Sequence, residues 1–215
     1  MAGEPRKHHF VPQFYLAGFT TNGSNDGELH GFDKNRRKTF RSTPRGVAHK
    51  RDFHKIVPGP QGDEMAVEKA LGKVECQWNT VLSAVIKNTA LPEGESFGDL
   101  MMFVGFLAVR VLRIRNIISD FIDRVSKAQI QMTLATPEGQ ASLRQTLADL
   151  GHAMPDEEFD KLVQFGQSGE YTVDYEQTWH VQEMIQMAAT IAPILSLRKW
   201  RIWVADESAP DLNGT

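Results

Sequence analysis

A change in the spacing of apolar residues near Asp63 constrains the fold more than any other feature of the sequence. After this point apolar residues recur at three- and four-residue steps, the period of an amphipathic helix. The first such stripe comprises Val67, Leu71, Val74, Trp78, Val81, Leu82 and Val85. Before Asp63, short segments alternate apolar and polar residues, as half-buried strands do. We therefore expect an α+β protein with a mostly helical body and a small, mainly antiparallel sheet.

Further helices are expected after the first stripe. Ser96 at an N-cap with Asp99 at N3 resembles a capping box, and it predicts a long buried helix that runs through Phe103, Leu107, Val111, Ile114, Ile118, Phe121 and Val125. Thr136 followed by Pro137 predicts another helix start. A further short helix is expected from Pro155, and a last one over residues 173–197.

The strands are expected at the two ends of the chain. Residues 28–42 read as a β-hairpin around the turn residues "DKNRR", and "RDFHKIV" at 51–57 reads as a third strand. The Trp-rich segment 199–205 alternates like a strand and is expected to return to the N-terminal strands. The sequence thus predicts one domain over 1–215: a strand-rich basic part (1–60), a helical body (61–198) and a returning strand (199–205).

Composition limits the class of protein. With 41% hydrophobic and 24% charged residues, the chain can bury a core. Its N-terminus has no apolar leader, and arginines interrupt its longest apolar helix, so we expect a cytoplasmic protein with no membrane partner. The single cysteine, Cys76, is expected to be a buried thiol. No phosphate-binding Gly-rich loop, Gly-x-Ser-x-Gly elbow or dinucleotide fingerprint is present, which disfavours the enzyme classes that need them.

Positive charge is concentrated near the N-terminus. Residues 1–60 carry eleven Lys and Arg against five Asp and Glu, whereas residues 61–215 carry thirteen against twenty-two. Residues 34–51 hold eight basic residues and no acidic one. This basic segment could attract the phosphates of nucleic acid, or it could be a solvated surface that pairs with acidic residues of the same chain. The candidate binding residues within it are Arg36, Arg37, Lys38, Arg41, Arg45, Lys50 and Arg51.

The opening stretch "KHHFVPQFYLAGF" (7–19) contributes the clearest chemical candidates. His8 and His9 are adjacent, so on an extended segment their rings point to opposite faces, and one could enter a site while the other turns away. Pro12 favours an extended backbone before it. An imidazole fixed in this way could act as a general base or as a ligand to a divalent metal ion.

Other candidates could complete such a site. Asp52 and His54 are two apart, so within a strand they would share a face. Glu68 and Glu75 are seven apart on the first helix and also share a face. We take His8, His9, Asp52, His54 and Glu75 as the candidate catalytic residues; histidines that only satisfy backbone groups are the alternative.

Two arginines are further candidates for binding an anion. Arg110 and Arg113 are expected to lie on one side of the long helix, where paired guanidinium groups could bind a phosphate or a carboxylate. An ion pair with Glu68, Glu75 or Asp174 is the alternative.

The segments "HHFVPQFYLAGF", "VAHKRDFHK", "VEKALGKVE" and "LRKWRIWVAD" together resemble the bacterial DUF4238 family over nearly the whole chain. The His-His-x-x-Pro opening, here His8, His9 and Pro12, is the most specific part of the resemblance. Members of that family usually continue into a Ser-Asp-Asn-Pro segment, where this sequence has "DLNGT", so we expect a shortened member or a missing C-terminal part. The resemblance implies no established activity.

Three hypotheses about function follow. The first is a hydrolase of phosphodiesters, metal-dependent and nuclease-like, in which the basic segment guides a polyanion. The second is a non-catalytic module that binds nucleic acid or a protein through residues 34–51. The third is a scaffold or immunity-type component whose histidines are structural. The sequence predicts no particular substrate, metal or oligomeric state.

Overall fold

The computed structural model describes residues 7–56 and 63–204. The chain forms two compact units, one comprising the residues up to Leu112 together with those from Gln177 onward, and the other comprising Arg113–Glu176. The first is called unit 1 and the second unit 2. The fold is mostly helical with two small antiparallel sheets, which confirms the predicted α+β class. That the chain is one domain stays a prediction.

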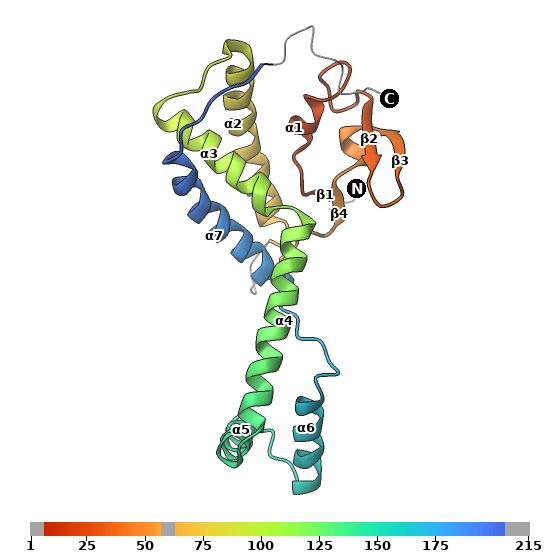
Figure 1. The fold of residues 1–215 in the computed structure, drawn as a ribbon, viewed down its shortest axis with the longest axis vertical. Coiled ribbons are helices and arrows are strands. Elements are labelled where there is room, and N and C mark those ends of the chain that lie inside the picture. The colour runs from red at the N-terminus through yellow and green to blue at the C-terminus, as the bar shows by residue number, and fades with distance from the viewer. Residues whose placement is uncertain (1–6, 57–62, 205–215) are drawn as a thin grey trace. The chain divides into compact units, whose positions relative to one another are not determined.

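Three helices build the core of unit 1: α2 (Ala66–Asn88), α3 (Gly94–Val109) and α7 (Gln177–Ser196) (Figure 1). The predicted stripe of α2 supplies Trp78, which is 2% exposed and packs on Phe103 and Phe106 of α3. Gly105 lets α3 approach α7 closely, because a Cβ at this position would lie 3.2 Å from the carbonyl oxygen of Ala188.

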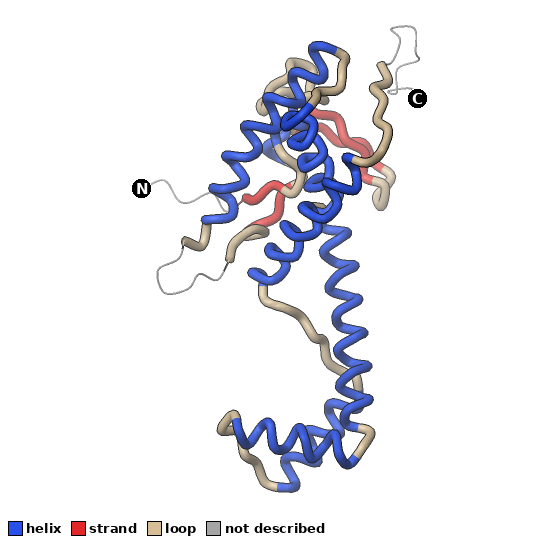
Figure 2. Tube along the Cα trace, turned by 90° about the vertical axis from the view of Figure 1, so that its left-hand side faces the viewer, coloured by secondary structure: helices blue, strands red, loops and turns tan. Residues whose placement is uncertain are grey.

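The strands found among the described residues all lie in the N-terminal part of unit 1 (Figure 2). The predicted hairpin is confirmed as β2 (Leu29–Asp33) and β3 (Lys38–Ser42). A second antiparallel pair joins β1 (Lys7–His9) to β4 (His49–Arg51). Between the strands lie α1 (Gln13–Ala17) and the 3-10 helix η1 (Pro44–Gly46). The rings of Phe14 and Tyr15 in α1 contact Phe103 and so attach the opening segment to the helical core.

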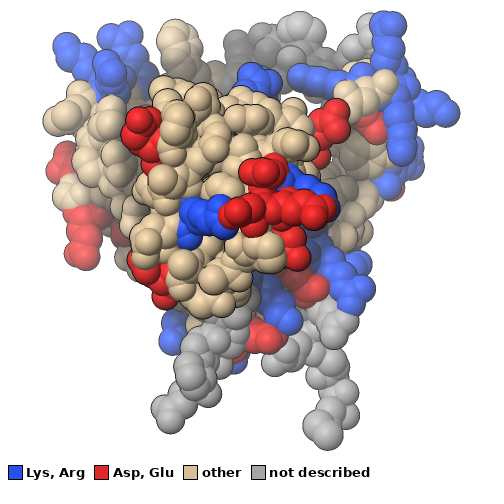
Figure 3. Space-filling view, turned by 90° about the horizontal axis from the view of Figure 1, so that it is seen from below, with Lys and Arg blue, Asp and Glu red and all other residues tan. Residues whose placement is uncertain are grey.

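Unit 2 comprises most of α4 (Leu112–Leu134) with α5 (Pro137–Asp149) and α6 (Asp156–Ser168). The predicted cap at Thr136 is confirmed, since its hydroxyl accepts the backbone N–H of Gly139. Three buried residues form the core of this unit: Leu134, Phe159 and Val163. The first turn of α6 is acidic. On the face seen in Figure 3, acidic side chains lie beside basic ones.

The predicted long helix is wrong in two respects. It begins at Gly94 with Glu93 rather than Ser96 at its N-cap, and it breaks at Arg110 and Val111. Neither residue at the break is glycine or proline, so propensity alone gives no signal for it. Beyond the break α4 is not buried, because Leu134 is the one residue of that helix in the buried class.

Two local predictions are also wrong. Of the described residues of the predicted third strand, 51–56, only Arg51 is in β4, and Asp52 leaves it with a positive φ of 56°; Val57 lies outside the described residues. Cys76 is exposed, because it lies on α2 away from the core stripe.

Other predictions are left open by the structure. Residues 199–204 form no strand, so the return of the Trp-rich segment to a sheet is not confirmed, and residue 205 lies outside the described residues. Among the described residues, no helix combines the length and apolar character that crossing a bilayer requires.

Candidate functional site

The pairing of β1 with β4 buries both opening histidines. In this register His8 lies opposite Lys50 and His9 lies opposite His49. The two side chains then have separate neighbours, as expected for adjacent strand residues. His8 stacks on His54, with ring centroids 5.6 Å apart, whereas His9 meets the His49 ring edge-on at 5.4 Å.

His8, His54 and Glu68 form a hydrogen-bonded cluster inside unit 1. The backbone N–H of His54 donates to Nδ1 of His8 at 2.8 Å. Nδ1 of His54 lies 2.7 Å from Oε2 of Glu68 on α2. Both imidazole side chains are fully buried, while the Glu68 side chain is 28% exposed. The cluster therefore reaches solvent at its carboxylate.

The turn that carries His54 is held by contacts on other elements. Gln177 at the start of α7 donates its side-chain N–H to the carbonyl oxygen of Phe53. The Phe53 ring packs against Phe10 and against His54 itself. These contacts fix the backbone on both sides of the imidazole.

The hydrogen bonds assign the neutral tautomer of each ring. His8 accepts a backbone N–H at Nδ1, so its proton is on Nε2. The His54 ring donates from Nδ1 to Glu68, so its Nε2 carries a free lone pair. Both Nε2 atoms are buried and have no hydrogen-bond partner. The cluster therefore presents one unused donor and one unused acceptor.

Burial favours the neutral forms of His54 and His9 by lowering the pKa of each ring. Desolvation lowers the pKa of His54 to about 4, although the hydrogen bond to Glu68 opposes this shift. Burial and the nearby His49 also lower the pKa of His9. Burial tends to raise the pKa of Glu68, but the hydrogen bond from His54 and the charges around it bring that pKa below its ordinary value.

A buried arginine adjoins the cluster. Arg110 caps α3 at the helix break, is 2% exposed, and donates from Nη1 to Oε1 of Glu75 at 2.5 Å. Its positive charge contributes to lowering the pKa of His9, His54 and Glu68. Its Nε is buried without a partner.

Unpaired buried polar atoms are expensive, which makes their location informative. Over residues 7–56 and 63–204, the buried side-chain nitrogens and oxygens that lack a partner are Nε2 of His8, His9 and His54 and Nε of Arg110. All four belong to this one region of unit 1.

The sequence-predicted site is brought together only in part. His8 and His54 converge, His9 is buried beside them against Gln13 and His49, and Glu75 pairs with Arg110. Asp52 lies outside the cluster, because its positive φ turns the chain and its carboxylate pairs with Arg51 at 3.4 Å. Glu68 takes the place expected for Asp52.

The predicted pairing of Arg110 with Arg113 on one helix is wrong. The break at the end of α3 puts Arg110 in unit 1, while Arg113 begins unit 2. The alternative, an ion pair with Glu75, holds for Arg110.

Much of the basic segment is neutralised locally. Arg36, Arg41 and Arg45 pair with Asp33, Glu28 and Asp26 at 3.3–3.9 Å, and Arg51 pairs with Asp52. Four of its cations have no ion pair with a described residue: Lys34, Arg37, Lys38 and Lys50.

The same three residues are candidate metal ligands. His8, His54 and Glu68 each offer one ligand atom, and these atoms lie within 4.8 Å of one another. Two imidazoles and a carboxylate suit a divalent ion such as Zn²⁺. However, Nδ1 of His8 and Nδ1 of His54 already take part in hydrogen bonds, and the protonated Nε2 of His8 cannot be a ligand. His54 alone has a free lone pair together with a carboxylate behind the ring.

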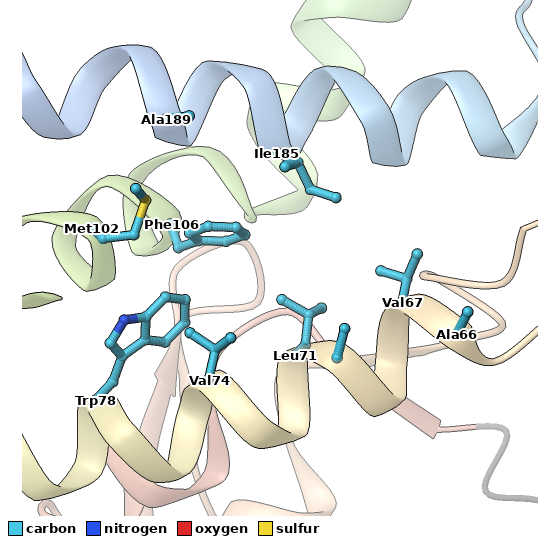
Figure 4. Close-up of a pocket in the computed structure, with 10 residues that line it drawn as sticks. Ala66, Val67, Leu71, Val74, Trp78, Met102, Phe106, Ile185 and Ala189 are labelled. Atoms are coloured by element: carbon cyan, nitrogen blue, oxygen red, sulfur yellow. The ribbon is translucent and has the colours of Figure 1, made fainter.

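A separate hollow of about 460 Å³ lies between α2, α3 and α7 (Figure 4). Its walls are apolar and include Leu71, Trp78, Phe106 and Ile185. Its lining residues include no acidic or basic side chain, so it does not compete with the histidine cluster as a site of acid–base chemistry.

Comparison with known proteins gives the same family as the resemblance of the sequence motifs. The model of the family described as "Protein of unknown function (DUF4238)" matches residues 7–212, so the chain belongs to this family. No curated protein and no solved structure matches it.

Proposed function

We propose that this member of the DUF4238 family is a hydrolase that cleaves phosphodiesters at the cluster of His8, His54, Glu68 and Arg110. The observation that carries the proposal is the set of buried, unpartnered atoms: Nε2 of His54, Nε2 of the His8 ring that stacks on it, and Nε of Arg110, whose charge acts on His54. A base next to donors for a charged oxygen is the arrangement that hydrolysis requires.

His54 acts as the general base. Its Nε2 takes a proton from water while the water oxygen attacks phosphorus and the bond to the leaving oxygen breaks. The resulting imidazolium then returns that proton to the leaving oxygen. Glu68 accepts the Nδ1–H throughout, which orients the ring and stabilises its charged form.

His8 and Arg110 bind the phosphoryl oxygens. His8 already accepts the backbone N–H of His54 at its Nδ1. It therefore donates a hydrogen bond from Nε2 and transfers no proton. The Nε–H of Arg110 supplies a charge-assisted hydrogen bond, while Glu75 holds the guanidinium group in place.

An anionic substrate fits the titration of His54 better than a neutral ester does. A base with a pKa of about 4 is weak near neutral pH. A phosphodiester beside the ring adds a negative charge, which raises that pKa toward the working range. A neutral substrate provides no such adjustment.

The test is hydrolysis of bis(p-nitrophenyl) phosphate and of a single-stranded oligonucleotide. We expect His54→Gln to reduce kcat/KM by about 100-fold or more and Glu68→Gln to reduce it less. His152→Gln is the matched control, because His152 is exposed in unit 2. A wild-type protein without activity, or an active His54→Gln variant, would contradict the proposal.

A chelator distinguishes this acid–base mechanism from the metal-dependent hypothesis. Because the hydrogen bonds described occupy both Nδ1 atoms, we expect activity to persist in EDTA. Activity that EDTA abolishes and Mn²⁺ or Zn²⁺ restores would instead assign the three residues to a metal site.

The binding alternative is supported by the four cations of residues 34–51 that have no ion pair with described residues. Four cations without an ion pair to a described residue are few for tight nucleic-acid binding, so we assign this segment a guiding role for a polyanionic substrate. In the test, all four cations are replaced by glutamine. If this variant binds nucleic acid with the affinity of wild type, the segment does not have this role.

A further inference from the structure

Helix α4 carries an apolar stripe that nothing covers within unit 2. Phe121 is 66% exposed, Val125 is 48% exposed and Met132 is 75% exposed, and Ile117 at the edge of the stripe is 51% exposed. Such large exposed apolar side chains in a row mark an interaction surface. Unit 2 therefore leaves this face of α4 open to a further packing partner.

The opposite face of α4 already has its partners. Asp123 accepts the backbone N–H of Val173 at 2.7 Å, and Lys127 lies over the ring of Tyr171. Leu134 enters the small core with α6. In Figure 1, α6 and the segment that leads toward α7 lie on the same side of α4. At about 100° per residue, this face is roughly 160° around the helix from Phe121 and Val125.

The stripe has the spacing of a coiled coil. Ile118, Val125 and Met132 are seven residues apart and correspond to a positions. Ile114, Phe121 and Ala128 are also seven apart and correspond to d positions. This 3.5-residue repeat keeps a seam in register along a second helix that has the same repeat. The spacing therefore specifies a helix as the covering element.

We propose that α4 pairs with α4 of a second copy of this chain in a parallel, two-stranded coiled coil. A second copy supplies the same repeat over the same length. Unit 2 also needs additional burial, because a core of three buried residues is small for a helical unit of this size, and association is one way in which small units gain stability.

The charges that flank the seam favour the parallel orientation. The g positions are Ile117, Arg124 and Gln131, and the e positions include Ile122 and Gln129. In parallel register Ile117 faces Ile122 of the other copy, and Arg124 faces Gln129, so no like charges meet. In an antiparallel pair that uses the whole stripe, the two Arg124 side chains would lie together near the twofold axis, which is unfavourable.

Light scattering on the full chain across a dilution series tests the association. We expect a dimer that dissociates on dilution, and a monomer for Phe121→Glu at every concentration. Asn116→Glu is the control, because Asn116 is exposed and off the stripe. A wild-type protein that stays monomeric at every concentration would overturn the proposal. This outcome includes a monomer in which unit 1 covers the stripe.

Disulfide trapping tests the orientation without relying on a disruptive substitution. In a Cys76→Ser background, Val125→Cys places each sulfur opposite its counterpart in a parallel pair, within disulfide reach. We expect oxidation to give a covalent dimer, and Asn116→Cys to stay monomeric. A monomeric Val125→Cys variant, or one that crosslinks no better than Asn116→Cys, would exclude the parallel pair.

Discussion

Acidification should destabilise unit 1 through His54. The pKa of this buried ring is about 4 in the folded protein, against an ordinary value of 6.5. Between these values the unfolded chain binds more protons than the folded one, so stability falls as pH is lowered through this window. Each pKa unit corresponds to about 1.4 kcal/mol, so the full loss is about 3 kcal/mol, most of which has occurred at pH 4.5.

Urea denaturation followed by tryptophan fluorescence measures this loss. All four tryptophans lie outside residues 113–176, so their fluorescence reports on unit 1. The lowered pKa values of His9 and Glu68 act in the same direction, and His54→Gln separates the contribution of His54 from theirs. We expect the variant to lose about 2–3 kcal/mol less than wild type between pH 7.5 and pH 4.5. Parallel stability curves for the two proteins would refute the reasoning.

Three further measurements address the ion pair, the core and the basic segment. Glu75→Gln leaves the Arg110 charge buried and unpaired, so we expect a loss of about 2 kcal/mol in the free energy of unfolding. The double variant Glu75→Gln/Arg110→Met should regain most of this loss. A Glu75→Gln variant that is as stable as wild type would contradict the prediction. Gly105→Leu should force α3 away from Ala188 and cost about 2 kcal/mol or more in urea denaturation, and an unchanged midpoint would show that the helices can separate freely. If the basic segment binds single-stranded nucleic acid through its four cations that have no ion pair with described residues, log Kd should change with log salt by a slope of about 3; a slope near zero would show that phosphate contacts are absent.

The choice of carboxylate at the candidate site shows what sequence reasoning could reach. Glu68 and Glu75 share one face of α2, and both were recognisable as neighbours of a possible site. Which of them meets a histidine depends on where other segments cross the helix: the turn at His54 reaches Glu68, and the end of α3 brings Arg110 to Glu75. Likewise, the two-residue spacing of Asp52 and His54 predicts a shared face only if the strand continues, and the positive φ of Asp52 ends it.

Features that arise from local interactions can be predicted from the amino-acid sequence. Apolar spacing predicts the helix α2, turn residues predict the hairpin, and Thr136 with Pro137 predicts a helix start, because each depends on neighbours within a few positions. Long-range packing is what ends α3 at Arg110, brings His8 and His54 to Glu68, and leaves the stripe of α4 exposed. A periodic stripe defines which face of a helix is apolar, but what packs on that face depends on contacts between residues far apart in the chain.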